Sequence, residues 1–170
     1  MRQDVDTMGE KICYQPIGII HTPFHDPAAM PIQPAGGESI TGTVEVYPDY
    51  AAGLKDIEGF SRIILVYHFH RSSAFELEVV PFLDTRPHGI FATRAPNRPN
   101  PVGISVVRLI KREGSCLSIS GIDIVDGTPL LDIKPYIPGC DAFTSGRTGW
   151  FPTDPSRVNH ARSDDRFPTS

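Results

Sequence analysis

The segment from Phe91 to Gly103, FATRAPNRPNPVG, carries the side chains best suited to hold an anion. Prolines at 96, 99 and 101 fix their own backbone φ and keep the preceding residues out of the helical region. We therefore expect a stiff loop whose polar side chains lose little further entropy when they bind. These side chains, two guanidinium groups and two amides, belong to Arg94, Asn97, Arg98 and Asn100.

Positive charge gathers around this loop. The stretch from Thr85 to Arg112 holds six Lys and Arg residues and no acidic one, although the chain has a net charge of -4. A local basic patch on an acidic chain favours an anionic ligand, such as a phosphate backbone or a carboxylate. The alternative is a solvated proline-rich connection on the surface of an all-β domain.

Two carboxylates flank a predicted turn in GIDIVDGTP. Asp123 and Asp126 precede Gly127, so carboxylates and exposed backbone groups converge on a small volume. Such a cluster suits a cationic ligand. The alternative for Asp126 is that it only caps the turn through its own backbone.

Two histidines stand two residues apart in a predicted strand. His68 and His70 then point to the same face, since side chains alternate along a strand. No third ligand lies at a recognisable spacing, so we predict no metal site; the alternative is a metal-dependent hydrolase that uses both histidines. We expect His70 to contact a cofactor or a substrate.

The remaining pattern predicts the elements that position these groups. Short runs rich in Ile, Val, Phe and Tyr alternate with Gly, Pro and Asp, which is typical of a mainly β fold, a small antiparallel β-barrel with one or two short helices. A hairpin turn is expected at Glu113-Gly114, and a short helix at 48–55. The expected strands cover 17–21, 42–47, 62–70, 75–80, 89–93, 104–110, 116–122 and 131–135.

Length and composition fit one domain. With 170 residues, 39% of them apolar, the chain can bury one core but has little room for a second. We expect a barrel domain over 12–150, a flexible N-terminal tail over 1–11 and a C-terminal tail over 151–170. The sequence has neither an apolar run of membrane length nor the apolar region of a signal peptide, so we expect a soluble, cytoplasmic protein. The three cysteines argue against a disulfide framework.

Four blocks of the sequence resemble one known family. FATRAPNRPNPVG followed by ISVVRL is similar to the signature of the TsaA-like (YaeB-like) proteins, the family of the tRNA methyltransferase TrmO. IGIIHTPF, GLKDIEGFSRIILVYHFHRS and GIDIVDGTPLLDIKPYIP stand in the order that the family shows. The resemblance implies S-adenosylmethionine as cofactor and tRNA as substrate. It also implies a homodimer and methylation of N6 of N6-threonylcarbamoyladenosine at position 37. Longer members carry a further C-terminal domain, which we expect to be absent here.

The resemblance also implies roles for single residues. The family's PRQ-like cofactor segment aligns with Met30 to Gln33, with Ile32 where an arginine is common, and the family's HQ-like pair aligns with His70 and Arg71. The implied cofactor residues are Pro31, Gln33, His70, Arg71, Arg94, Asp123, Ile124, Val125 and Asp126. The implied substrate residues are Arg94, Asn97, Arg98 and Asn100.

The expected reaction needs a proton acceptor, because the N6 nitrogen is urea-like and a poor nucleophile until its proton leaves. Asp126 and His70 are the candidate catalytic residues. A different class of function stays open, that of a module which binds S-adenosylmethionine or RNA without turnover.

Overall fold

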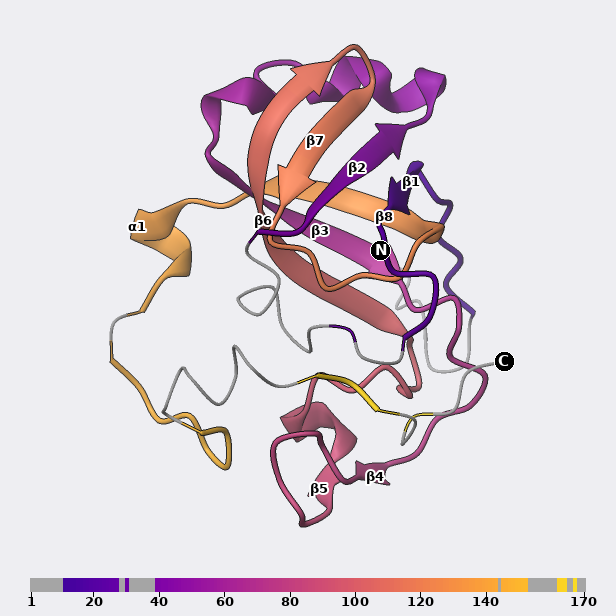
Figure 1. Ribbon diagram of the computed structural model, residues 1–170, viewed down its shortest axis with the longest axis vertical. Helices are drawn as coiled ribbons and strands as arrows, with labels where there is room; N and C mark the ends of the chain where they lie inside the picture. Colours follow the sequence, from indigo (N-terminus) through magenta and orange to yellow (C-terminus); the bar gives the residue numbers. More distant parts are fainter. Residues whose placement is uncertain are drawn as a thin grey trace, which may run out of the picture.

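The computed structural model describes residues 11–27, 30, 39–143, 145–152, 162–164 and 167. Six strands form a closed antiparallel barrel in the order β1-β2-β7-β6-β3-β8, and β1 pairs with both β2 and β8 (Figure 1). The mainly β barrel predicted from the sequence is confirmed. The barrel strands are β1 (Gly18–His21), β2 (Thr41–Val46), β3 (Arg62–His68), β6 (Val102–Glu113), β7 (Cys116–Ser120) and β8 (Thr128–Pro135).

Alternating side chains fill the barrel. In β3, Ile63, Leu65 and Tyr67 are buried, and the residues between them are less so. This alternation is the period-two pattern of a strand with one face on a core. Ile20, Val44, Val107, Leu117 and Leu130 complete the centre of the cluster from the other five strands.

Short helices and one hairpin finish the barrel. The predicted helix at 48–55 is a 3₁₀ helix, η2 (Pro48–Leu54), followed by η3 (Ile57–Gly59). The predicted hairpin joins β6 to β7, and Gly114 there has a positive φ of 62° that favours glycine. A single α-helical turn, α1 (Pro138–Asp141), follows β8.

Between β3 and β6 the chain leaves the barrel over residues 69–101, which we call the insertion. It holds the two-residue strands β4 (Glu78–Val79) and β5 (His88–Gly89), paired with each other, and the 3₁₀ turn η4 (Ile90–Ala92). In Figure 1 it lies at the end of the molecule opposite η2. The predictions of longer strands at 75–80 and 89–93 were wrong. The apolar residues there pack into a small cluster of Val79, Ile90 and Ala95, with no barrel strand alongside to extend a ladder.

The described part of the C-terminal segment returns to the insertion. Phe167 packs on the small cluster and makes an edge contact with Phe82, with ring centroids 5.1 Å apart. Ser163 Oγ accepts a hydrogen bond from Met30 N–H at 2.9 Å. The segment thus bridges the insertion and the loop that follows β1. No helix among the described residues is long and apolar enough to cross a membrane.

Candidate functional site

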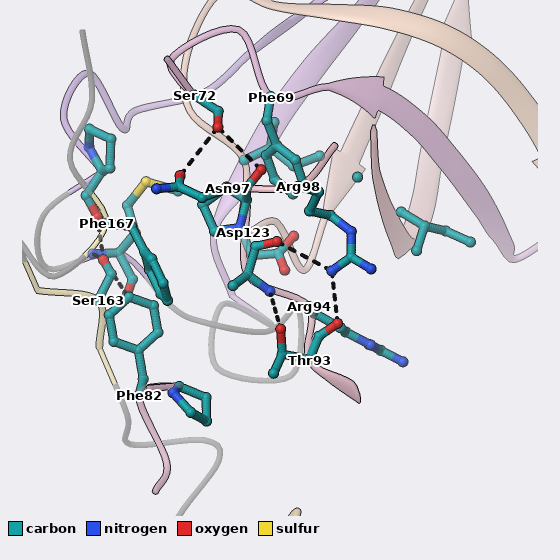
Figure 2. Close-up of a pocket in the computed structure, with 18 of the residues that line it drawn as sticks. Phe69, Ser72, Phe82, Thr93, Arg94, Asn97, Arg98, Asp123, Ser163 and Phe167 are labelled. Atoms are coloured by element: carbon teal, nitrogen blue, oxygen red, sulfur yellow. Dashed lines mark hydrogen bonds between the residues drawn. The ribbon is translucent and has the colours of Figure 1, made fainter. Parts of the chain in front are cut away.

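A cavity of about 750 Å³ lies between one end of the barrel and the insertion. The barrel contributes the ends of β3 and β6 and the segment 123–125, and the insertion contributes residues 91–98. Ser163 and Phe167 from the C-terminal segment also line it (Figure 2). Its walls are mostly apolar with a few converging polar groups, which is the usual character of a small-molecule site.

Aromatic rings form part of the wall on the barrel side. Tyr67 and Phe69 meet edge to face, with ring centroids 5.4 Å apart. Gly103 lies opposite Tyr67 in the paired strand, and a Cβ atom added there would stand 2.3 Å from Tyr67 Cε2. Gly103, the glycine that ends PNPVG, is therefore required because the two rings lie too close to its Cα for any side chain to fit.

Arg98 ties the loop of the insertion to itself. Its Nη1 donates hydrogen bonds to the backbone carbonyls of Thr93 at 2.9 Å and Ile90 at 3.1 Å, and its guanidinium carbon lies 6.0 Å from the Phe91 ring centroid. Figure 2 shows this side chain reaching back across its own loop. One nitrogen of the predicted anion binder is thus already engaged with backbone oxygens.

The other polar residues of the motif differ in exposure. Asn97 is buried, and its Oδ1 lies 3.2 Å from Ser72 Oγ, which also lies 3.3 Å from the carbonyl of Pro96. Arg94 is exposed and lines the cavity, whereas Asn100 is exposed and lies outside its lining. Within the motif, Arg94 is thus the exposed cation of the cavity lining.

Asp123 is the carboxylate that the barrel offers to the cavity. Its Oδ1 accepts a 2.6 Å hydrogen bond from the hydroxyl of Ser105, which lies 3.0 Å from the Tyr67 hydroxyl. Burial raises the pKa of Asp123 to about 6, against the lowering effects of the Ser105 hydrogen bond and the charge of Arg94. Burial also raises the pKa of Tyr67, so this phenol stays protonated.

Asp126 is held differently. Its Oδ1 accepts a hydrogen bond from the backbone N–H of Thr22 at 3.0 Å, and its oxygens lie 3.4 Å from His25 Nδ1 and 3.7 Å from His21 Nδ1. The Thr22 hydrogen bond, with the nearby histidines, lowers the pKa of Asp126. This carboxylate is not part of the cavity lining. The contacts instead fix the loop after β1 against the turn at Gly127.

His70 lines the cavity and is partly buried. Its Nδ1 lies 3.3 Å from Thr128 Oγ1, and burial, followed by the charges of Arg71 and His68, lowers its pKa. Arg71 also lines the cavity and donates to the carbonyl of His25 at 3.4 Å. Across the part of the chain that is described, no group of three or more His, Cys, Asp or Glu residues is placed to hold a metal ion.

The structure therefore brings most of the expected residues to one place. Asp126 and Asn100 lie outside the lining, and Pro31 and Gln33 lie outside the described residues. The residues gathered at the cavity are His70, Arg71, Arg94, Asn97, Arg98, Asp123, Ile124 and Val125.

Sequence reasoning missed several residues of the site. Ser105 and Tyr67 looked like ordinary strand residues, and only the period-two pattern combined with a buried hydroxyl could have drawn attention to Ser105. Trp150 stacks on His88, with ring centroids 4.7 Å apart, and its Nε1 donates to the carbonyl of Ala92 at 2.8 Å. The available signal for Trp150 was its segment, GRTGW over 146–150, which resembles a segment that ends the shorter members of the family.

A closed barrel with a mixed-charge cavity under a basic loop defines a small-barrel ligand-binding domain. Residues 19–142 match the family model of the tRNA-methyltransferase O N-terminal domain, so the chain belongs to that family, as the motifs predicted.

Relatives agree with this membership. A protein of Pyrococcus abyssi named "Probable S-adenosyl-L-methionine-binding protein" is 56% identical over 92% of this chain and 85% of its own length. The mouse tRNA (adenine(37)-N6)-methyltransferase is 32% identical over 75% of this chain and 31% of its own length. A crystal structure of TrmO from Pseudomonas aeruginosa superposes with a TM-score of 0.71 at 39% identity, covering 84% of this chain and 64% of that one. The chain thus spans less than two thirds of the TrmO structure.

Proposed function

We propose that this protein is an S-adenosylmethionine-dependent methyltransferase that acts on N6 of N6-threonylcarbamoyladenosine at position 37 of tRNA. Family membership and the names of the relatives support the reaction class and the cofactor. The observation that carries the proposal is the cavity, where the Asp123 carboxylate and the Arg94 guanidinium line one volume of about 750 Å³.

The residues at the cavity suit this cofactor. When bound, S-adenosylmethionine supplies an electrophilic methyl group on a sulfonium. Arg94 and Arg71 would pair with its carboxylate, and Asp123 would attract its ammonium or sulfonium. Ile124, Val125 and the Tyr67–Phe69 rings offer apolar surface for its adenosine. Pro31, Gln33 and Asp126 belong to the same proposed cofactor set on the strength of the motif match alone.

The insertion would receive the tRNA. Arg94 is exposed and lines the cavity beside the loop that the tRNA would approach. Besides the cofactor's carboxylate, we assign to Arg94 the substrate's carboxylate or a flanking phosphate. Arg98 and Asn97 hold the loop that presents it, and Asn100 would contact the RNA from outside the cavity.

Methyl transfer to unmethylated tRNA, followed by mass spectrometry of its nucleosides, tests this function. We expect the methylated nucleoside only when tRNA carries the threonylcarbamoyl group. Arg94→Ala should weaken tRNA binding and reduce its salt dependence by about one unit of slope, since one phosphate contact is lost. Lys55→Ala, an exposed charge outside the cavity, is the matched control. Binding of S-adenosylmethionine without any transfer would instead indicate a binding module.

We further propose a cytoplasmic homodimer. The outward faces of β3 and β6 carry a row of apolar residues, with Ile64 opposite Val106 and Val66 opposite Ile104. Ile104 is 55% exposed and also lines the cavity, so a partner seated on this row would border the site. Ile104→Glu should convert the dimer to monomer in sedimentation equilibrium. A wild-type protein that sediments as a monomer at micromolar concentration would contradict the dimer.

A further inference from the structure

Asp123 is the carboxylate best placed to take part in chemistry inside the cavity. Among the described residues of the lining, Asp123 and Asp164 are the two that carry carboxylates. Asp164 comes from the C-terminal segment, whereas Asp123 follows β7 and is fixed to β6 through Ser105. A group that must meet a reacting atom within a few tenths of an ångström is better placed on a rigid barrel than on a terminal segment.

A directed chain of hydrogen bonds supports Asp123. The Ser105 hydroxyl donates its one proton to Asp123 Oδ1, so the 3.0 Å contact with Tyr67 is filled by the Tyr67 O–H donating to Ser105 Oγ. Both hydroxyl groups are buried, at 2% and 4% residue exposure. The chain fixes the orientation of a carboxylate that lines the cavity.

Asp126, the other candidate acid, is already engaged. Its Oδ1 accepts the Thr22 N–H and its Oδ2 lies 3.4 Å from His25 Nδ1, outside the cavity lining. Its lowered pKa also makes it a weaker base. Asp126 acts as a positioning residue that fixes the loop after β1.

We propose that Asp123 is the proton acceptor of the methyl transfer, an inference that rests on the proposed function. As the N6 nitrogen attacks, a nitrogen–carbon bond forms and the carbon–sulfur bond breaks, with its electron pair going to sulfur. The N6 proton moves to the Asp123 carboxylate. The products are the N6-methylated nucleoside, neutral S-adenosylhomocysteine and a protonated Asp123, which returns its proton to water after product release.

The electrostatic surroundings suit this role. The groups around Asp123 are Tyr67 from β3, Ser105 from β6, Arg94 from the insertion, and His70, Arg71 and Asp164 elsewhere in the lining. With a pKa of about 6, the carboxylate is ionised at neutral pH yet more basic than an ordinary aspartate. A base whose pKa lies near the working pH is the most effective acceptor.

Single-turnover methylation at saturating cofactor and tRNA tests the assignment. We expect the wild-type rate to rise with pH and to level off above about pH 6. Asp123→Asn, which keeps the shape of the side chain, should lower the rate by about 10² and remove this inflection. Asp132→Asn, the same change at a half-exposed aspartate of β8 outside the cavity lining, is the matched control and should leave the rate and the inflection unchanged.

Ser105→Ala combined with Tyr67→Phe gives a second test that a purely structural role would not pass. The two hydroxyl groups are hydrogen-bonded to each other, so removing both together leaves neither of them buried without its partner. Because the Ser105 hydrogen bond lowers the pKa of Asp123, its loss should move the inflection to higher pH while the rate above the inflection is retained. A thermal melt confirms that the double variant is folded.

The outcomes separate the possibilities. No transfer by the wild-type protein overturns the proposed function and this inference with it. Transfer by wild-type with an undiminished rate in Asp123→Asn overturns the inference alone. So does loss of the inflection in His70→Gln, which would assign the proton to the imidazole. Calorimetry with S-adenosylhomocysteine sets the concentration that saturates each protein, because Asp123→Asn also loses an attraction to the cofactor. A lower rate at that saturation then reflects the chemical step.

Discussion

The barrel and the insertion meet at the same cavity but are held together in different ways. The barrel has a continuous ladder of paired strands around a large cluster of buried aliphatic side chains. The insertion has a two-residue ladder and a cluster of three buried residues. Its shape depends on side chains that bond to its own backbone, above all Arg98, Thr93 and Ser72.

This difference in packing matches a difference in the roles of the barrel and the insertion. The barrel supplies a rigid surface with a fixed carboxylate at Asp123, and the insertion supplies a loop that can carry charge toward a large, anionic partner. Regions with few buried apolar contacts open at lower free energy than core strands. We therefore expect the insertion to open locally while the barrel stays folded.

The largest expected effect tests the barrel. Leu65→Ala removes a fully buried side chain from β3 and should lower the free energy of unfolding by about 2–5 kcal/mol. Ile90→Ala, equally buried but in the small cluster of the insertion, should cost less in global unfolding and mainly speed hydrogen exchange of the insertion. Urea unfolding and native-state hydrogen exchange measure the two. Equal global losses would mean that barrel and insertion unfold as one unit.

The second prediction concerns the cost of the fixed carboxylate. Asp123 has a pKa of about 6 in the folded protein and 3.8 when unperturbed, so its contribution to stability is present below pH 3.8 and is lost as pH rises through 6. At pH 7 this amounts to about 3 kcal/mol of lost stability. Asp123→Asn should thus be more stable than wild-type at pH 7, and the difference should shrink toward pH 4. Urea midpoints between pH 4 and 7 measure it, and a less stable variant at pH 7 would contradict it.

The smallest effect is expected in the insertion. Arg98→Gln removes the Nη1 donor to the carbonyls of Ile90 and Thr93, which should destabilise the loop by about 1–3 kcal/mol. We expect faster exchange of the amides around η4 and weaker tRNA binding, while the melting temperature of the barrel changes little. Arg86→Gln, an exposed arginine of the same insertion outside the cavity lining, is the control. A drop in melting temperature as large as that of Leu65→Ala would show that the barrel depends on this loop.

The barrel strands and the residues of the signature loop could be read from the sequence, because both depend on local information. Alternation along 62–68 and 116–120 is imposed by a strand with one buried face, and Gly114 and the prolines restrict the backbone where they stand. The insertion was harder to predict. Runs such as 75–80 have the composition of strands, but pairing needs a neighbour, and the neighbour is set by the tertiary fold.

The sequence by itself determined that this chain is a small barrel of the tRNA-methyltransferase O family with a basic, proline-stiffened loop. Only the tertiary structure decided which of those polar residues face the cavity. Asp123 and Asp126 are three residues apart and chemically identical. Their surroundings differ because Ser105 from β6 and Thr22 from the loop after β1 are brought to them by long-range pairing. A carboxylate's pKa depends on burial and partners, and neither is encoded within the turn that carries it.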